Sequence, residues 1–524
     1  MTGIRSNLHH LLTQSAQRLP DAPALTYKNE TATYSEVAAA VASVAGHLRE
    51  LGLRRGDRVA ILLEKRIETV VAMFAVSAAG GIFVPVNSVL KPAQVEHILG
   101  DSGARILVTT ADRLRQLADL LRQARIEHVV VVGECAGVAR QDVPYGLHAW
   151  RAASAPNGGL GEPAAIDVDP AAILYTSGST GKPKGVVLSH RNLLVGAESV
   201  STYLHNTSDD VILSALPLSF DAGLSQITTA FCVGAHVILL NYLLPREVPA
   251  LCARHGVTGL TAVPPLWLQL ADVPWPEEAA RRLRYFANTG GRMPRPTLDR
   301  LRATFTVADP YLMYGLTEAF RSTYLDPAEV DRRPDSIGKA IPNAEILVLR
   351  PDGTPCGPGE PGELVHRGAL VALGYWNDPA RTAERFRPVT HAGQDWRAPE
   401  LAVWSGDTVV ADEEGFLFFV GRSDDMIKTS GYRVSPTEIE EAAYSTGLVR
   451  DAVALGVADA ALGQRILLIA SPVQPELDVA ALIAALRRLL PLYMVPARIE
   501  VRGELPRSPN GKFDRALLKS EVAA

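Results

Sequence analysis

The chain has 524 residues, 47% of them hydrophobic and 21% charged, which suggests about three or four compact units, or fewer if one is a large α/β unit. Its net charge of −5 argues against a general nucleic-acid-binding protein, because such a protein needs a basic face. The four cysteines (Cys135, Cys232, Cys252 and Cys356) are far apart and form no CxxC pair, which argues against a disulfide framework or a zinc site and fits a reducing cytoplasm.

The start of the chain carries scattered polar residues instead of the continuous apolar core of a signal peptide. Residues 69–90 are uncharged and long enough to span a bilayer, but glycines, a proline and an asparagine interrupt them. We therefore expect a buried helix at 70–79, a turn and a short strand at 82–86, and no membrane span.

Helices and strands alternate along the first half of the chain, which favours parallel sheets covered by helices. Ser35 is the expected N-cap of a long alanine-rich helix that ends near Leu51. Residues 112–124 have the pattern of a charged amphipathic helix. The other expected elements are a helix at 8–19, a hairpin of strands 24–27 and 31–34, and buried strands at 58–63, 106–109, 128–132, 211–216, 235–240 and 259–263.

A linker rich in Gly, Pro and Ala at 152–170 precedes the stretch 173–194, which reads ILYTSGSTGKPKGVVLSHRNLL. The pattern is a strand, a glycine-rich loop, a second strand and a helix cap. Glycines let several backbone N–H groups point at one anion, and the hydroxyls and lysines add donors and positive charge, so the loop suits a polyphosphate. It is not a Walker A loop, because only two residues separate Gly178 from Gly181-Lys182. Taken alone, the loop also fits a flexible surface turn.

Two further motifs follow. Gly290 and Gly291 come after an expected strand and allow a flat ring to approach the backbone, although without context a plain turn is the simpler interpretation. Residues 311–319 read YLMYGLTEA and put Thr317 beside Glu318. A hydroxyl and a carboxylate side by side can hold a phosphate oxygen and Mg²⁺. Without other motifs, the first turn of a helix is the simpler reading.

The pattern changes after residue 336. Short β runs at 345–349, 363–367 and 416–420 alternate with Gly/Pro turns, which indicates a small β-barrel subdomain. Within it, Ser405-Gly406-Asp407 by itself fits a turn in solvent.

The last hundred or so residues read helix, strand, strand, helix, as in an independent α+β unit. Residues 421–433 read GRSDDMIKTSGYR, which alone would be a charged interdomain loop. Residues 506–515 read PRSPNGKFDR, and their turn presents Lys512, which alone would be a solvated lysine.

Together and in this order, the motifs resemble those of the acyl-adenylate-forming superfamily, which includes acyl-CoA synthetases, peptide-synthetase adenylation domains and luciferases. Weaker resemblance covers residues 8–518. It implies an α/β fold with a large N-terminal domain of parallel sheets covered by helices plus a small β-barrel, and a small mobile α+β C-terminal domain. The implied domains are a nucleotide- and acyl-binding domain at 1–422 with its barrel at 335–422, a hinge at 423–424 and a mobile lid at 425–524.

The resemblance also implies the ligands and the roles of single residues. The implied ligands are ATP, Mg²⁺, a small carboxylic or amino acid as the substrate, and a pantetheine thiol as the acyl acceptor. Lys512 would be the catalytic lysine, Glu318 the magnesium ligand and Thr317 a contact of the α-phosphate. The residues implied in phosphate binding are Thr176, Ser177, Gly178, Ser179, Thr180, Gly181, Lys182 and Lys184. Tyr314 would lie near the adenine, Gly290 and Gly291 would line the adenine site and the wall of the acyl pocket, and Asp407 and Arg422 would contact the ribose. Asp424 would be the hinge, and Gly431 would line the thiol tunnel.

The implied reaction is ATP-dependent activation of a carboxylate as an acyl-adenylate, with release of pyrophosphate, followed by transfer to a thiol. No carrier-protein module follows the small domain, so we expect the thiol to be free CoA or to belong to a separate carrier protein, and we favour CoA. The alternative is a stand-alone adenylation enzyme that loads an amino acid or acyl group onto a carrier protein.

The identity of the acid stays open. Phe220, Asp221 and Gly315 fall where the superfamily builds its acyl pocket, and amino-acid-activating relatives carry an Asp directly after this Phe. Residues 219–231 and 315–325, however, most resemble acyl-CoA ligases associated with exosortase and exopolysaccharide loci, which also carry the Asp. Arg321 could pair with Asp221 or with an acidic substrate.

Overall fold

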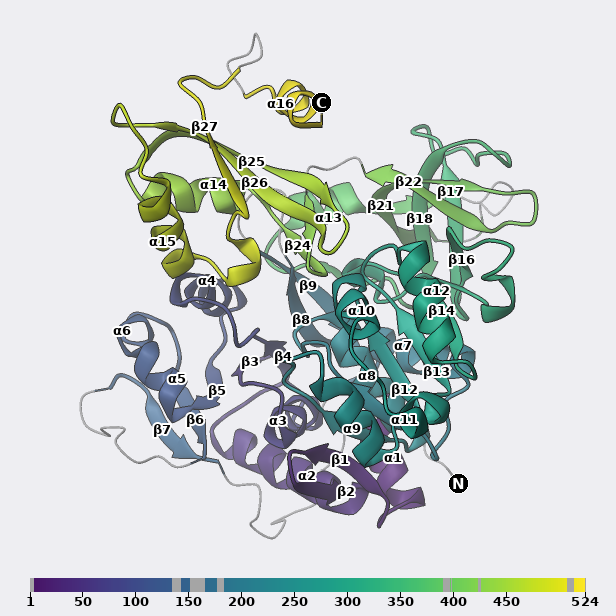
Figure 1. The fold of residues 1–524 in the computed structure, drawn as a ribbon. Coiled ribbons are helices and arrows are strands. Elements are labelled where there is room, and N and C mark those ends of the chain that lie inside the picture. Colours follow the sequence, from purple (N-terminus) through teal and green to yellow (C-terminus); the bar gives the residue numbers. More distant parts are fainter. Residues whose placement is uncertain are drawn as a thin grey trace.

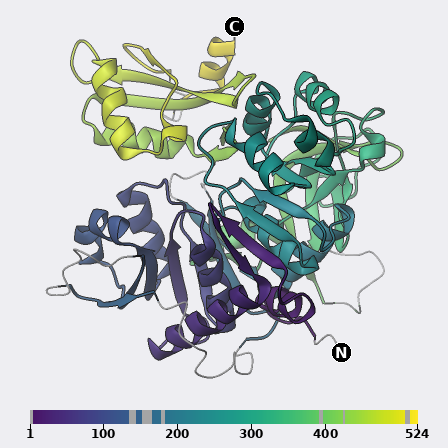
Figure 2. The same cartoon turned by 60° about the horizontal axis from the view of Figure 1, so that its bottom comes forward.

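The computed structural model describes residues 4–133, 143–150, 165–176, 183–389, 396, 398–422, 426–506 and 513–523. Within these residues the strands form three sheets, two large ones in the body of the molecule and a small one near the carboxyl end of the chain. Figure 1 shows the small sheet and its helices (yellow-green to yellow) beside the body (purple to green), and Figure 2 shows the same arrangement from another side.

The first large sheet has a parallel centre. In spatial order its strands are β19 (Gly374–Tyr375), β9 (Lys184–Ser189), β8 (Pro170–Thr176), β4 (Ile82–Pro85), β3 (Arg58–Leu62), β5 (Ile106–Thr110), β6 (His128–Val132) and β7 (Gly146–Ala149). In β3, Val59 and Ile61 belong to one hydrophobic core, and Ala60 and Leu62 belong to another. Since successive side chains of a strand face opposite sides, both faces of this sheet are buried, which explains its continuous apolar strands.

The second large sheet joins a parallel part to an antiparallel part. In spatial order its strands are β17 (Ala344–Leu349), β18 (Gly362–Gly368), β21 (Glu400–Ala411), β22 (Leu417–Arg422), β16 (Ser336–Ala340), β15 (Thr323–Leu325), β14 (Asp309–Tyr314), β13 (Tyr285–Asn288), β12 (Gly259–Ala262), β10 (Val211–Ser214), β11 (His236–Leu239), β1 (Pro23–Tyr27) and β2 (Glu30–Thr33), with β20 (Phe386–Val389) beside β21. Strands β10 to β14 pair in parallel, and antiparallel pairing begins with β15. The region expected as a barrel is this antiparallel part, which the β15–β16 pairing makes continuous with the parallel part.

Helices fill the space between the two large sheets and cover their outer faces. The helices α3 (Ile67–Ala78), α7 (His190–Tyr203) and α8 (Asp221–Val233) share one core with side chains of both sheets, and α3 and α8 are buried along most of their length. The other helices of the body are α1 (His10–Arg18), α2 (Tyr34–Glu50), α4 (Pro92–Ser102), α5 (Ala111–Gln116), α6 (Ala118–Leu121), α9 (Glu247–His255), α10 (Pro264–Ala271), α11 (Glu277–Arg282), α12 (Arg295–Thr304) and α13 (Pro379–Arg385). In the described part of the chain, no helix is both long enough and apolar enough to cross a bilayer.

The small sheet and its helices form a unit with its own hydrophobic cores. Its elements are the strands β23 (Ile427–Thr429), β24 (Tyr432–Val434), β25 (Val449–Asp459), β26 (Gly463–Pro472) and β27 (Arg498–Val501) and the helices α14 (Pro436–Ser445), α15 (Val479–Leu489), η3 (Leu492–Met494) and α16 (Arg515–Ala523). Ala454 of β25 packs on the face covered by α14 and α15, and the next residue, Leu455, packs on the face covered by α16. The expected order helix, strand, strand, helix is present as α14, β25, β26 and α15.

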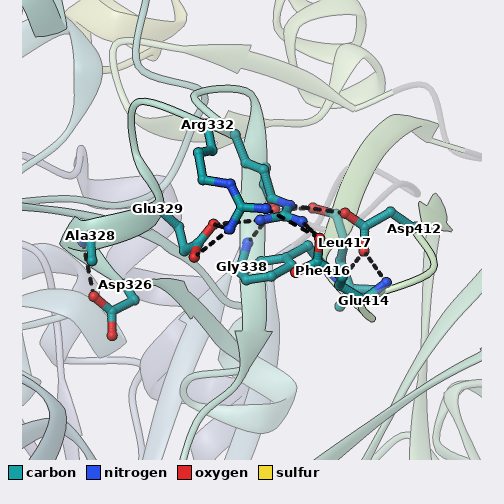
Figure 3. Close-up of polar contacts among 11 residues, drawn as sticks. Asp326, Ala328, Glu329, Arg332, Gly338, Asp412, Glu414, Phe416 and Leu417 are labelled. Atoms are coloured by element: carbon teal, nitrogen blue, oxygen red, sulfur yellow. Dashed lines mark hydrogen bonds and ion pairs between the residues drawn. The ribbon is translucent and has the colours of Figure 1, made fainter.

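A cluster of charged residues joins two loops of the antiparallel part of the second sheet (Figure 3). The loop after the short helix η2 (Pro327–Glu329) lies against the turn between β21 and β22. Arg333 Nε donates to Asp412 Oδ2 (3.0 Å), and its guanidinium lies 4.0 Å from the centroid of the Phe416 ring. Glu329 accepts hydrogen bonds from Arg332 and Arg333, so the cluster holds the antiparallel strands in place.

Two local predictions are wrong. The N-cap of α2 is Thr33 instead of Ser35, because Thr33 Oγ1 accepts from the Glu36 N–H (3.3 Å) while the Glu36 carboxylate accepts from the Thr33 N–H (2.8 Å). The helix expected at 112–124 is divided into α5 and α6, because the backbone leaves helical geometry at the buried Leu117 (φ −105°, ψ 5°). Most of the linker expected at 152–170 lies outside the described residues.

Candidate active site

The loops that follow the parallel strands of the second sheet meet at one edge. Gly290 and Gly291 come after β13, Tyr314 ends β14, and α8 and α10 begin after β10 and β12. Open α/β sheets bind ligands outside this carboxyl edge. Gly290 has φ 75°, and a Cβ on Gly291 would come within 3.2 Å of the Pro264 ring, so the two glycines let the backbone pass close to α10.

Glu318 lies at the centre of this edge. It is 2% exposed and belongs to the short helix η1 (Thr317–Ala319) just after β14, with Thr317 partly exposed beside it. Glu318 Oε1 accepts hydrogen bonds from Lys184 Nζ (2.9 Å) and from the Tyr375 hydroxyl (2.7 Å). Lys184 begins β9 and Tyr375 ends β19, so this network joins the two large sheets.

Positive charges keep Glu318 ionised. Burial by itself would raise the pKa of Glu318, but the nearby charges of Lys184, Arg433 and Arg385 outweigh that effect and hold the pKa well below its usual range. Arg433 belongs to β24, so the small unit contributes to the field at this carboxylate.

An ionised carboxylate in this position fits Mg²⁺ that arrives with a nucleotide. Mg²⁺ is commonly held by one or two carboxylates together with substrate phosphates and water. Among the described residues there is no cluster of three or more His, Cys, Asp or Glu side chains that could hold a metal. A single ionised carboxylate such as Glu318 is compatible with a metal that is bound largely through phosphates.

The residues expected at the adenine and ribose also come together. The Tyr314 hydroxyl donates a hydrogen bond to Asp407 Oδ2, and Asp407 is 2% exposed. The pairing of β21 with β22 puts Asp407 directly opposite Arg422. A carboxylate has two acceptor oxygens, so Asp407 is suited to the two hydroxyls of a ribose.

The small unit touches the body at the same edge through the hairpin of β23 and β24. The hairpin turn is Ser430-Gly431, with φ 53° and 78°, and two positive φ values are typical of a tight two-residue hairpin. A Cβ on Gly431 would come within 2.8 Å of a Val263 side-chain carbon. The Tyr432 ring packs edge-on against Phe220, with ring centroids 5.2 Å apart. Gly431, expected at a thiol tunnel, therefore lies against the body beside Phe220.

A second contact between the small unit and the body is nearly buried. Gln94 Nε2 of α4 donates to Glu438 Oε1 of α14 (2.8 Å). Burial raises the pKa of Glu438 to about 7, although the hydrogen bond from Gln94 opposes the shift. This contact therefore places a carboxyl group that titrates near neutral pH between the two parts of the molecule.

The residues expected in the acyl pocket contact one another. Arg321 Nη1 donates to Asp221 Oδ2 (3.0 Å), and the Arg321 side chain is 3% exposed, so the expected pairing of these two residues is confirmed. Asp221 is the first residue of α8 and Phe220 its N-cap. A Cβ on Gly315 would come within 3.3 Å of Arg321 Cα, so Gly315 allows the chain to return close to its own path.

The phosphate loop is described only at its two ends. Thr176 and Lys184 are register partners on the antiparallel strands β8 and β9, so Thr176 lies across from the lysine that pairs with Glu318. The Thr176 hydroxyl is buried and has no hydrogen-bond partner among the described residues. The predictions that lie outside the described residues concern Ser177, Gly178, Ser179, Thr180, Gly181, Lys182, Asp424 and Lys512, and the side chain of Arg422 also lies outside them.

Sequence analysis missed three residues of this site, including Arg385, whose charge acts on Glu318 although no motif contains it. Tyr375 lies almost 60 residues after Glu318, and only its place after a glycine in a short apolar run could have drawn attention to it. Arg433 belongs to the motif 421–433, but nothing in that motif shows that its charge acts on Glu318.

These features define an α/β nucleotide-binding enzyme whose site is completed by a second, smaller unit. Residues 12–376 match the family described as AMP-binding enzyme, and residues 438–512 match the AMP-binding enzyme C-terminal domain. The chain is 30% identical to a long-chain-fatty-acid–CoA ligase of Salmonella typhimurium (98% of this chain, 94% of the relative) and 32% identical to a feruloyl-CoA synthase of Amycolatopsis sp (97% and 96%). Its structure is similar to that of o-succinylbenzoate CoA synthetase from Bacillus subtilis, with a TM-score of 0.81 and 27% identity over 97% of this chain and 98% of that one.

The chain therefore belongs to the family of AMP-binding enzymes, and it is an AMP-forming acid–thiol ligase. The expected superfamily and the expected fold class are both confirmed.

Proposed function

We propose that this enzyme activates a small carboxylic acid with ATP and transfers the acyl group to the thiol of CoA. In the first step a carboxylate oxygen attacks the α-phosphorus, the bond from that phosphorus to the β-phosphate oxygen breaks, and pyrophosphate leaves. In the second step the thiol loses its proton, its sulfur attacks the acyl carbon, and AMP leaves with the carboxylate oxygen. The observation that carries the proposal is the buried ion pair of Glu318 and Lys184 beside Tyr314 and Asp407, in a chain of this family.

Both reactants of the first step are anions, so the site must offset their repulsion and align them. We assign the phosphates to Thr176, Lys184 and the loop between them, the α-phosphate to Thr317, the adenine to Tyr314 with Gly290 and Gly291, and the ribose to Asp407 and Arg422. Mg²⁺, when bound with ATP, supplies charge neutralisation at the phosphates, and Glu318 is the residue that would hold it. Lys184 then has a second use, because its ammonium becomes available to the departing pyrophosphate.

The small unit is proposed as a mobile lid of residues 425–524 that follows a hinge at 423–424, with residues 1–422 as the body. Its α14 and its β23–β24 hairpin touch the body. The residues that flank the segment with Lys512 lie on the other face of the small sheet: Leu505 and Phe513 pack there, and the Asp514 N–H donates to the Pro506 carbonyl (2.9 Å). We propose that the lid turns between the two steps, with Lys512 at the carboxylate in the first step and away from it in the second.

The test measures each step separately. We expect acid-dependent exchange of pyrophosphate into ATP, and a thioester with CoA when the thiol is added. Lys512→Ala is expected to remove most of the exchange, while thioester formation from supplied acyl-adenylate stays largely intact. Equal loss of both half-reactions would contradict the role of Lys512, and a thioester formed only on an added carrier protein would contradict the choice of CoA.

A further inference from the structure

One face of α8 is small and polar. Ala222, Ser225, Gln226 and Thr229 follow the spacing i, i+3, i+4, i+7, so they share one side of the helix, and all four line a cavity. The other side of α8, including Phe231, packs in the core between the two large sheets. We refer to the cavity as the acyl cavity, because Ala222, the residue after Asp221, and Arg321, which pairs with Asp221, both line it.

The acyl cavity is small, and both polar and apolar side chains line it. Besides the residues of α8, Tyr285 and Arg321 contribute polar groups to its wall, and Val200, Leu204, Ile212 and Met313 contribute apolar ones. The space open to the centre of a water molecule is about 20 Å³, which holds about one water or one small substituent. A long alkyl chain would need a much larger space.

Two polar atoms in this wall lack a partner. Arg321 Nε and Thr229 Oγ1 are both buried, and neither forms a hydrogen bond with any described residue. Arg321 is 3% exposed and Thr229 is 2% exposed. A buried polar atom left without a partner is unfavourable, so these two atoms indicate an oxygen-bearing occupant.

The charge of Arg321 is already balanced. Its Nη1 donates to Asp221 Oδ2 (3.0 Å) and to the Phe320 carbonyl (3.2 Å), which leaves the Nε–H as a donor on a neutral ion pair. A distal carboxylate would meet the negative charges of Asp221 and Glu318, and a distal ammonium would meet the guanidinium of Arg321. Either charged group would lose its hydration on binding, and the neutral ion pair would not compensate for that loss with a net opposite charge.

The backbone is strained to put Arg321 in this position. Phe320 has φ 56° and ψ −51°, which is rare for a bulky residue, and it is fully buried. A Cβ on Gly196 would come within 2.5 Å of the Phe320 ring, so only the glycine in α7 leaves room for that ring. The strained turn points Glu318 at the phosphate side and Arg321 at the acyl cavity, and strain of this kind gathers at functional sites.

We propose, resting on the function proposed above, that the enzyme selects a short-chain acid whose far end carries an uncharged oxygen, a hydroxyl or a carbonyl. That oxygen accepts the Arg321 Nε–H and forms a hydrogen bond with the Thr229 hydroxyl. The relatives named for long-chain fatty acids and ferulate therefore do not predict the substrate of this chain.

The test is pyrophosphate exchange by the full-length enzyme with four acids of equal chain length that end in a methyl, a hydroxyl, a carboxylate or an ammonium group, at several lengths. We expect the hydroxy acid to have a kcat/KM about tenfold or more above the methyl acid, with both charged acids below it, and long-chain fatty acids to be poor substrates. Exchange that is best with a methyl-ended or charged acid overturns this inference but leaves the proposed function standing. No exchange with any acid overturns the proposed function itself.

Two matched variants link the preference to the cavity. Thr229→Val removes the hydroxyl while keeping the shape, and we expect the preference for the hydroxy acid over the methyl acid to fall about tenfold. Thr228→Val removes the neighbouring buried hydroxyl, which donates to the Ser225 carbonyl (3.3 Å) and does not line the cavity, so the preference should stay as in the parent enzyme. If Thr229→Val and Thr228→Val had the same preference for the hydroxy acid over the methyl acid, this would show that water alone occupies the cavity, and the inference would be overturned.

Discussion

The hydroxyl of Tyr375 is predicted to position the carboxylate of Glu318. In Tyr375→Phe the ring stays, including its contact with Lys184, whose Nζ lies 3.9 Å from the ring centroid. The variant loses the hydrogen bond that the hydroxyl donates to Glu318 Oε1 (2.7 Å), one of the two that the structure gives this oxygen, and the hydrogen bond that the hydroxyl accepts from Lys184 Nζ. A hydrogen bond to a charged acceptor contributes about 1.5–3 kcal/mol, which corresponds to about a tenfold to hundredfold change.

The assay is pyrophosphate exchange as a function of Mg²⁺ concentration. Groups that orient a metal ligand typically change metal affinity by about 10–100-fold when removed, so we expect the Mg²⁺ required for half-maximal exchange to rise by that factor. The control is Tyr34→Phe, which also loses a buried tyrosine hydroxyl, here with its hydrogen bond to the Ala235 carbonyl (2.6 Å), but at the start of α2 instead of at the site. Tyr34→Phe should lower the melting temperature without changing the Mg²⁺ dependence. Identical Mg²⁺ dependence in both variants would refute the role of Tyr375.

Three further predictions concern the lid and the packing of the body. Gly431→Ala puts a Cβ within 2.8 Å of Val263 at φ 78°, so thioester formation should slow by about tenfold or more while pyrophosphate exchange changes little; equal slowing of both would contradict this. The pKa of Glu438 is raised to about 7 in the docked lid, so its contribution to docking is complete below its ordinary value of 4.5 and is lost as the pH rises through about 7. Interdomain fluorescence transfer should follow that curve, and Glu438→Gln should flatten it. Gly223→Ala brings a Cβ within 2.0 Å of a backbone carbonyl oxygen and should strongly destabilise the fold, whereas Gly46→Ala, with open space in α2, should stabilise it by about 0.5–1 kcal/mol in thermal unfolding.

Local sequence patterns predict most of the secondary structure, because buried helices and strands have characteristic spacings or runs of apolar residues. The apolar runs at 58–63 and 82–86 are strands, and the uncharged run at 70–79 is a helix packed between two sheets. The two errors concern helix limits. Thr33 caps α2 because Glu36, three residues later, completes its capping box, and the helical pattern of 112–124 is interrupted where the backbone leaves helical geometry at Leu117.

The residues of the site can also be divided into those that local motifs predict and those that they do not. Glu318, Asp407 and Lys184 belong to local motifs, so the order of residues around each of them is enough for the resemblance to point to them. Tyr375 and Arg433 act on Glu318 only because the chain brings β19 and the small unit to the same place. No sequence spacing carries that information.

The pairing of Arg321 with Asp221 shows what geometry adds. The sequence left two readings open, a pair between the two residues or an acidic substrate held by Arg321. The hydrogen bond of 3.0 Å shows that the pair forms. The Arg321 Nε, which has no partner among the described residues, is the basis for proposing an uncharged oxygen on the substrate.

The most direct test of the account follows an oxygen atom. The enzyme is given an acid labelled with ¹⁸O in its carboxylate, together with ATP, Mg²⁺ and CoA, and the products are analysed by mass spectrometry. If the carboxylate attacks the α-phosphorus, AMP gains one ¹⁸O atom and pyrophosphate gains none. Label in pyrophosphate or phosphate, or thioester formed with unlabelled AMP, would contradict the acyl-adenylate on which every assignment above depends.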